Sequence, residues 1–100
     1  MVLKKVDDAN MEQLFDVMLM LENKEECYAF FEDLTTTKEI QTLSQRLQVA
    51  KMLLHGSTYL EIEVTTGAST AIISRIKRSL QHGNGSYKLM LERLAARTQS

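Results

Sequence analysis

The sequence predicts an all-α fold, and three observations support this prediction. The chain has 100 residues with no proline and only four glycines, so few positions interrupt a helix. Apolar residues make up 44% and charged residues 25%, which is typical of a globular protein and excludes a disordered chain. Apolar side chains recur at spacings of three and four residues, the period of an amphipathic helix. We expect one helical domain over residues 1–94 and a disordered tail over residues 95–100.

Six helices are expected, and the first two are short and amphipathic. The first covers about residues 9–21, where the apolar positions form a helical stripe. The second covers about residues 24–33, and Asn23 with Glu26 has nearly the spacing of a capping box. Because the second helix is apolar on more than one side, we expect it to pack between two other elements.

The third helix has the clearest boundaries in the sequence. Thr36 and Glu39 form an [ST]-x-x-[DE] capping box at its start, and Gly56 is suited to the left-handed position beyond its end. At 1.5 Å per residue, a helix of ~19 residues spans ~28 Å, which is long enough to cross a small domain. Its predicted apolar stripe consists of Ile40, Leu43, Leu47, Ala50 and Leu54.

Two short helices joined by a tight turn follow. Thr58 and Glu61 form another capping box, which begins a helix of about eight residues that Gly67 ends. The next helix covers about residues 70–81, with Ser69 as its cap. A last helix begins at about Ser86. The expected core residues of the two short helices are Leu60, Ile62, Val64, Ile72, Ile73, Ile76 and Leu80, with the small Ala68 letting the helices approach.

This arrangement predicts a helix-turn-helix over about residues 58–81. In such a unit, the N-terminal part of the second helix meets base edges in the DNA major groove, and cations further along contact phosphates. The first 56 residues carry six basic and ten acidic side chains, whereas residues 57–100 carry six basic and three acidic ones. No acid occurs from residue 65 to residue 91. The residues predicted to bind DNA are Ser69, Thr70, Ala71, Ser74, Arg75, Lys77, Arg78 and Lys88.

Several segments resemble the tryptophan-repressor family. They are Leu43-Ser44-Gln45-Arg46-Leu47, residues 53–56 (LLHG) and residues 66–75 (TGASTAIISR). The ending at residues 87–94 (YKLMLERL) is similar to the YerC/YecD branch of that family in Gram-positive bacteria. The resemblance implies an intertwined homodimer that represses transcription by binding a double-stranded DNA operator. Such a dimer places two recognition helices about 34 Å apart, one turn of DNA.

The resemblance also implies a corepressor site, from which this sequence departs. Arg46 and Arg75 match the two arginines around the tryptophan pocket, so they are the candidate effector-binding residues. Ile76 stands where that repressor has a glycine that leaves room for the indole ring. Basic positions of the family's fourth helix are Leu60 and Glu63 here. These departures argue against tryptophan binding, and another small-molecule corepressor stays an open alternative.

Other functions are not supported by the residues. The sequence has no phosphate-binding glycine loop, no nucleophile motif and no His/Cys set at ligand spacing, so we expect neither an enzyme nor a cofactor or metal site. The longest apolar run, residues 17–21, is far shorter than the ~20 residues of a membrane span. Cys27 is the single cysteine, which favours a reducing, cytoplasmic location. Glu61 and Glu63 would oppose phosphate binding if they face outward. The alternative function is a helical protein-interaction module without operator binding.

Overall fold

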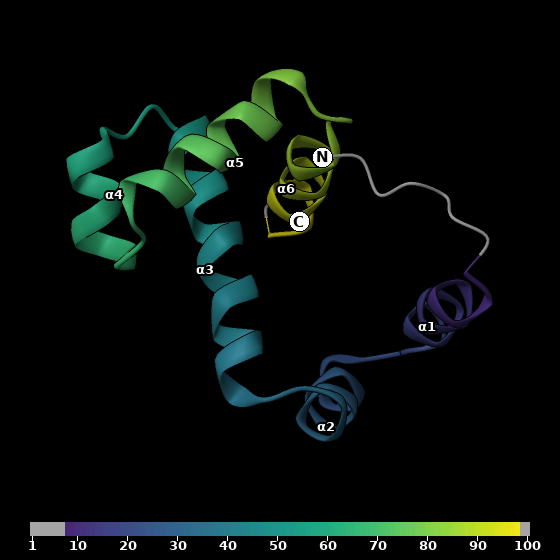
Figure 1. Cartoon of the computed structure of the whole chain (residues 1–100). Coiled ribbons are helices and arrows are strands. Elements are labelled where there is room, and N and C mark those ends of the chain that lie inside the picture. The colour runs from purple at the N-terminus through teal and green to yellow at the C-terminus, as the bar shows by residue number, and fades with distance from the viewer. Residues whose placement is uncertain (1–7, 99–100) are drawn as a thin grey trace. The chain divides into compact units, whose positions relative to one another are not determined.

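The structure is a computed structural model that describes residues 8–98, and every regular element in that range is a helix, as predicted. Contacts within the chain divide it into two compact units, and the boundary along the sequence falls between residues 40 and 41. The first unit holds two short helices, and the second holds the helix-turn-helix and the C-terminal helix (Figure 1). The six helices are α1 (Ala9–Leu19), α2 (Lys24–Leu34), α3 (Thr37–Leu54), α4 (Tyr59–Thr66), α5 (Thr70–His82) and α6 (Ser86–Thr98).

The two capping boxes form as the sequence predicts. The Thr36 backbone N–H donates to Glu39 Oε1 at 2.8 Å, and the Glu39 N–H donates back to the Thr36 hydroxyl at 3.1 Å. The same exchange joins Thr58 and Glu61 at 2.9 and 3.2 Å. In each pair, the pKa of the glutamate is lowered from its ordinary value of 4.5. The larger cause is the hydrogen bond with the threonine backbone N–H, and the smaller cause is the hydrogen bond with the threonine side chain. Both glutamates are therefore carboxylates that stabilise a helix start.

One predicted boundary is wrong. The sequence predicts a disordered tail from Ala95, but α6 continues to Thr98. Alanine and arginine at positions 95–97 favour a helix, and the Thr98 hydroxyl donates to the Leu94 carbonyl at 3.2 Å. The remaining two positions of the predicted tail lie outside the described residues.

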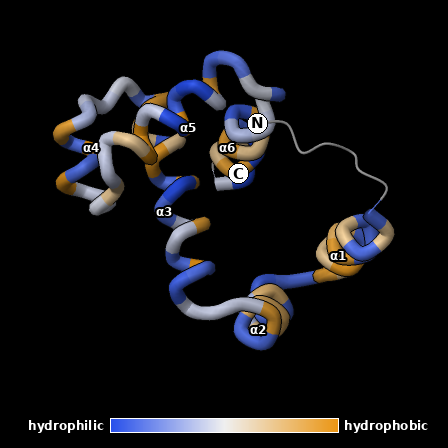
Figure 2. The backbone as a smooth tube through the Cα atoms, in the orientation of Figure 1, coloured by the Kyte–Doolittle hydropathy of each residue, from blue (hydrophilic) through white to orange (hydrophobic). Residues whose placement is uncertain are grey.

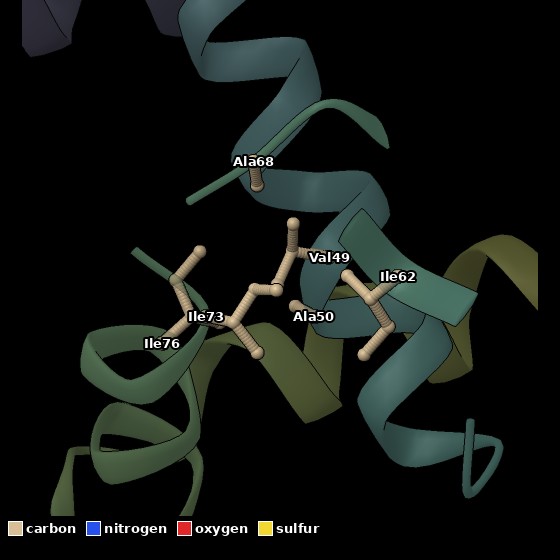
Figure 3. Packing of buried hydrophobic residues seen from close by; sticks show 6 residues of the cluster. All are labelled: Val49, Ala50, Ile62, Ala68, Ile73 and Ile76. Carbon is tan, nitrogen blue, oxygen red and sulfur yellow. The ribbon is translucent and has the colours of Figure 1, made fainter. Parts of the chain in front are cut away.

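The core of the second unit is built from short apolar side chains of three helices and one turn. Ile62 of α4 and Ile73 of α5 are fully buried against α3 (Figure 3). Partly buried side chains from α6, including Tyr87 and Leu91, pack against the same cluster. Its buried members are Val49, Ala50, Ile62, Ala68, Ile73 and Ile76.

The predicted burial of Leu60 and Val64 is wrong. These side chains are 69% and 78% exposed, whereas Ile62 between them is 0% exposed. Successive residues of a helix are about 100° apart, so positions 60 and 64 share a face that is opposite to position 62. A helix of eight residues that buries Ile62 against α3 must therefore turn the other two side chains towards water.

Many large apolar side chains of this single chain stay exposed. On α3, Val49 and Ala50 enter the core, while the predicted stripe residues Leu43, Leu47 and Leu54 are exposed. Apolar positions also cover much of α1 and α2 (Figure 2). In the part of the chain that is described, no helix combines the length and hydropathy needed to cross a bilayer. The exposed residues of the first unit include Leu14, Phe15, Leu19, Met20, Tyr28 and Leu34.

Ile62→Ala is expected to reduce the free energy of unfolding by about 2–5 kcal/mol, because it removes a fully buried side chain and leaves a cavity. Val64→Ala, on the same helix, removes exposed methyl groups and should change stability by less than about 0.5 kcal/mol. Urea unfolding followed by circular dichroism measures both variants. Equal losses in the two variants would contradict this assignment of the buried face of α4.

The capping boxes should make stability depend on acid pH. Because the folded-state pKa values of Glu39 and Glu61 lie below 4.5, their contribution is present above that pH and is lost as the pH falls through the lowered values. The double variant Glu39→Gln, Glu61→Gln keeps the hydrogen-bonding shape but cannot titrate. We expect it to lose less stability than the native chain as the pH falls below 4.5. The control is Glu25→Gln with Glu32→Gln, on exposed positions of α2, and equal acid sensitivity in both double variants would refute the expectation.

Candidate nucleic-acid interface

The turn between α4 and α5 has the geometry that a helix-turn-helix requires. Gly67 ends α4 in the left-handed region, with φ of +73°, and its N–H donates to the Glu63 carbonyl at 2.9 Å. Ala68 follows and is only 3% exposed, because it belongs to the core cluster. The Ser69 hydroxyl then accepts a hydrogen bond from the Ile72 N–H at 3.2 Å and begins α5. These features confirm the predicted sequence of glycine, small residue and cap.

The end of α4 is also tied to α3 by a polar contact. The Gln45 side-chain Nε2 donates to the Thr66 carbonyl at 3.0 Å. Since this carbonyl is in the last turn of α4, it has no partner within the helix. Gln45 supplies that partner, while Ile62 and Ile73 pack against α3 in the core. Polar and apolar contacts together hold the helix-turn-helix on α3.

The helix α5 is sharply divided into two faces. Ile73 and Ile76 are buried, and Ile72 and Leu80 are partly buried, as the sequence predicts. No acidic side chain occurs in α5. All the candidate DNA-binding residues lie on the solvent side: Ser69, Thr70, Ala71, Ser74, Arg75, Lys77 and Arg78 on or next to α5, and Lys88 on α6.

Two side chains of α4 reach the exposed face of α5. The Thr70 hydroxyl donates to the Glu63 carboxylate. The Tyr59 and Ser74 hydroxyl oxygens are 3.4 Å apart, and Lys77 Nζ lies 5.6 Å from the centroid of the Tyr59 ring. No motif in the sequence assigns a role to Tyr59, and the sequence indicates Glu63 only as an unfavourable charge. Their one-turn spacing on α4 was the signal that they share a face.

The candidate effector residues have different environments. The Arg46 guanidinium on α3 has a buried Nε that makes no hydrogen bond within the described residues. Arg75 is exposed on α5. Ile76 is 4% exposed and belongs to the core, so its branched side chain occupies volume that a glycine would leave empty. Among residues 8–98, no group of three metal-binding side chains comes together.

A buried inner face, a glycine turn and an exposed cationic second helix define a protein of the helix-turn-helix class. The family profile described as Trp repressor protein matches residues 9–95. The chain therefore belongs to the Trp repressor family, a family of regulatory DNA-binding proteins.

One relative is similar in sequence, and two solved structures are similar in sequence and in fold. The uncharacterized protein YerC of Bacillus subtilis is 52% identical over 94 residues, which cover 94% of this chain and 90% of YerC. A crystal structure of a candidate Trp repressor from Staphylococcus aureus is 58% identical, with a TM-score of 0.88 and 95% of each chain covered. A TrpR-like protein from Eubacterium eligens is 52% identical, with a TM-score of 0.86 and 91% of this chain and 94% of that chain covered.

Proposed function

We propose that this protein is a homodimeric, sequence-specific DNA-binding regulator that represses transcription from an operator. The observation that carries the proposal is that one face of α5 is polar and exposed while the opposite face is buried in the core. The buried face fixes the direction in which the polar face points. Thr70, Ala71 and Ser74 are short enough to let the helix approach base edges in the major groove. Lys77 and Arg78 are placed further along α5, where cations contact phosphates. Such a regulator acts on DNA in the cytoplasm.

The charge distribution supports this orientation towards DNA. The acid-free segment from residue 65 to residue 91 includes the turn, all of α5 and the start of α6, and it carries four basic side chains. By contrast, ten of the thirteen acidic residues lie in the first 56 positions. A phosphate backbone attracts the first of these regions and repels the second.

The exposed apolar surface supports a homodimer. A single chain leaves Leu43, Leu47 and Leu54 of α3 in water, together with apolar side chains of α1 and α2. A second copy related by twofold symmetry would cover such surfaces, since the same patch meets itself across an isologous interface. The dimer would also present two α5 helices to a palindromic operator.

DNA binding is proposed to be independent of tryptophan. The buried Ile76 side chain of α5 occupies volume that a glycine would leave empty, and this opposes the entry of an indole ring at the place that the resemblance implies. The expected result is therefore equal DNA affinity with and without L-tryptophan, measured by fluorescence anisotropy with a labelled operator duplex. Ile76→Gly is the matched variant that reopens the space. A tryptophan response of the native chain would contradict the proposal, and a response of Ile76→Gly alone would support the filled pocket.

The test of DNA binding is selection from random duplexes at two salt concentrations. We expect enrichment of a palindromic site and a steep loss of affinity with salt. Lys77→Ala and Arg78→Ala should each weaken binding to all sequences alike and lower the slope of log K against log salt by about 0.9 for each phosphate that is no longer neutralised. Lys24→Ala, on α2, is the control of equal charge change and should leave the slope unaltered.

Two results would contradict this assignment. Unchanged affinity and salt slope in both α5 variants would show that the basic face does not contact phosphate. Absence of enrichment by the native chain would favour the alternative, a helical protein-interaction module without an operator.

A further inference from the structure

The structure shows three contacts between one face of α4 and the exposed face of α5. Tyr59 and Glu63 are one turn apart on α4, and they contact Thr70, Ser74 and Lys77, which lie on successive turns of α5. Each of these three α5 residues is a candidate DNA-binding residue. These contacts restrict the conformations of the three side chains in the free protein.

The contact between Thr70 and Glu63 restricts the hydrogen bonds that Thr70 can offer to DNA. A threonine hydroxyl has one proton and two acceptor lone pairs, while an ionised carboxylate can only accept. Since the Thr70 proton is directed to Glu63, the free capacity of the hydroxyl is that of an acceptor. Glu63 itself adds further acceptor oxygens beside it. The pair therefore presents acceptors and no donor.

We propose that Glu63 and Tyr59 are positioning residues that determine which bases α5 reads. The proposal rests on the proposed function, because it requires α5 to enter the major groove. There, adenine N6 and cytosine N4 are the donors, whereas guanine and thymine present acceptors at O6 and O4. An acceptor-only Thr70 thus selects adenine or cytosine at the base that it meets. It rejects guanine and thymine, whose acceptors would face another acceptor.

Tyr59 acts on the neighbouring turns of α5. Its hydroxyl lies within hydrogen-bond distance of Ser74, and its ring lies within cation–π distance of the Lys77 ammonium. The two contacts order a base-reading hydroxyl and a phosphate-binding cation before DNA arrives. Binding then immobilises fewer free side chains, which lowers the entropic cost of association.

The experiment begins with selection of a site from random duplexes by the native chain. Affinities are then measured for variants of that site in which each position carries each of the four bases in turn. It compares the full-length native chain with Glu63→Gln, Thr70→Val and Tyr59→Phe. Glu61→Gln is the matched control, because it removes the same charge from α4 at a residue that bonds Thr58 rather than α5. A uniform gain in affinity from the lost negative charge is expected in both glutamine variants.

The discriminating result is confined to single base positions. At one symmetric pair of positions, the native chain should prefer adenine or cytosine over guanine or thymine. Thr70→Val and Glu63→Gln should both reduce that preference by about two- to tenfold, at the same positions, and Glu61→Gln should not. Tyr59→Phe, which keeps the ring over Lys77, should alter discrimination at the Ser74 position without changing the salt slope.

Failure of this inference and failure of the proposed function give different results. In one case, the native chain selects a site and Glu63→Gln has the same base preference as Glu61→Gln at every operator position. This result refutes the role of Glu63 but leaves the proposed DNA binding intact. If Thr70→Val keeps the native preference, the acceptor argument is refuted even where Glu63→Gln folds poorly. A native chain that selects no site refutes both proposals.

Discussion

The packing of Ile62 and Ile73 against Val49 and Ala50 of α3 is the constraint on which the rest of the second unit depends. It determines which face of α4 and which face of α5 are withdrawn from water, and therefore which side chains remain for binding. The close approach of α4 and α5 requires a small side chain at position 68 and a residue that adopts the left-handed conformation at position 67, which are Ala68 and Gly67. Loss of this packing would release α5 from the orientation that presents its polar face.

Burial of one residue of α4 gives the short helix three distinct sides. With Ile62 turned inward, Leu60 and Val64 are placed opposite to it in water, and Tyr59 and Glu63 are placed along α5. The acidic side chain that the sequence indicates as an obstacle to phosphate is thus a hydrogen-bond acceptor for Thr70. Its unfavourable field at the DNA backbone and its favourable contact with α5 are separate effects, and comparing Glu63→Gln with Glu61→Gln distinguishes them, because only the first residue contacts α5.

Local signals in the sequence were sufficient for most of the fold. The capping pairs, Gly67 and the divided faces of α5 are each specified by a few neighbouring residues, and the helices form where these signals place them. Leu60 and Val64 were predicted wrongly because hydrophobicity alone does not tell which of two apolar faces a short helix buries. The contacts from Tyr59 and Glu63 were not foreseen because they depend on how α4 lies beside α5, which spacing along the chain does not give. The helical end of α6 was missed because its small and charged residues carry no apolar stripe.

The role of α5 as the DNA-reading helix is tested by titrating the isotope-labelled protein with a short duplex and following the amide chemical shifts in NMR spectra. Even a duplex of arbitrary sequence suffices, because phosphate contacts position the protein before bases are read. We predict that the perturbed amides cluster at the turn after α4 and along the exposed face of α5, and that the perturbations fade as salt is raised. Perturbations confined to α1 and α2, or none at low salt, would contradict the assignment of α5 as the DNA-reading helix.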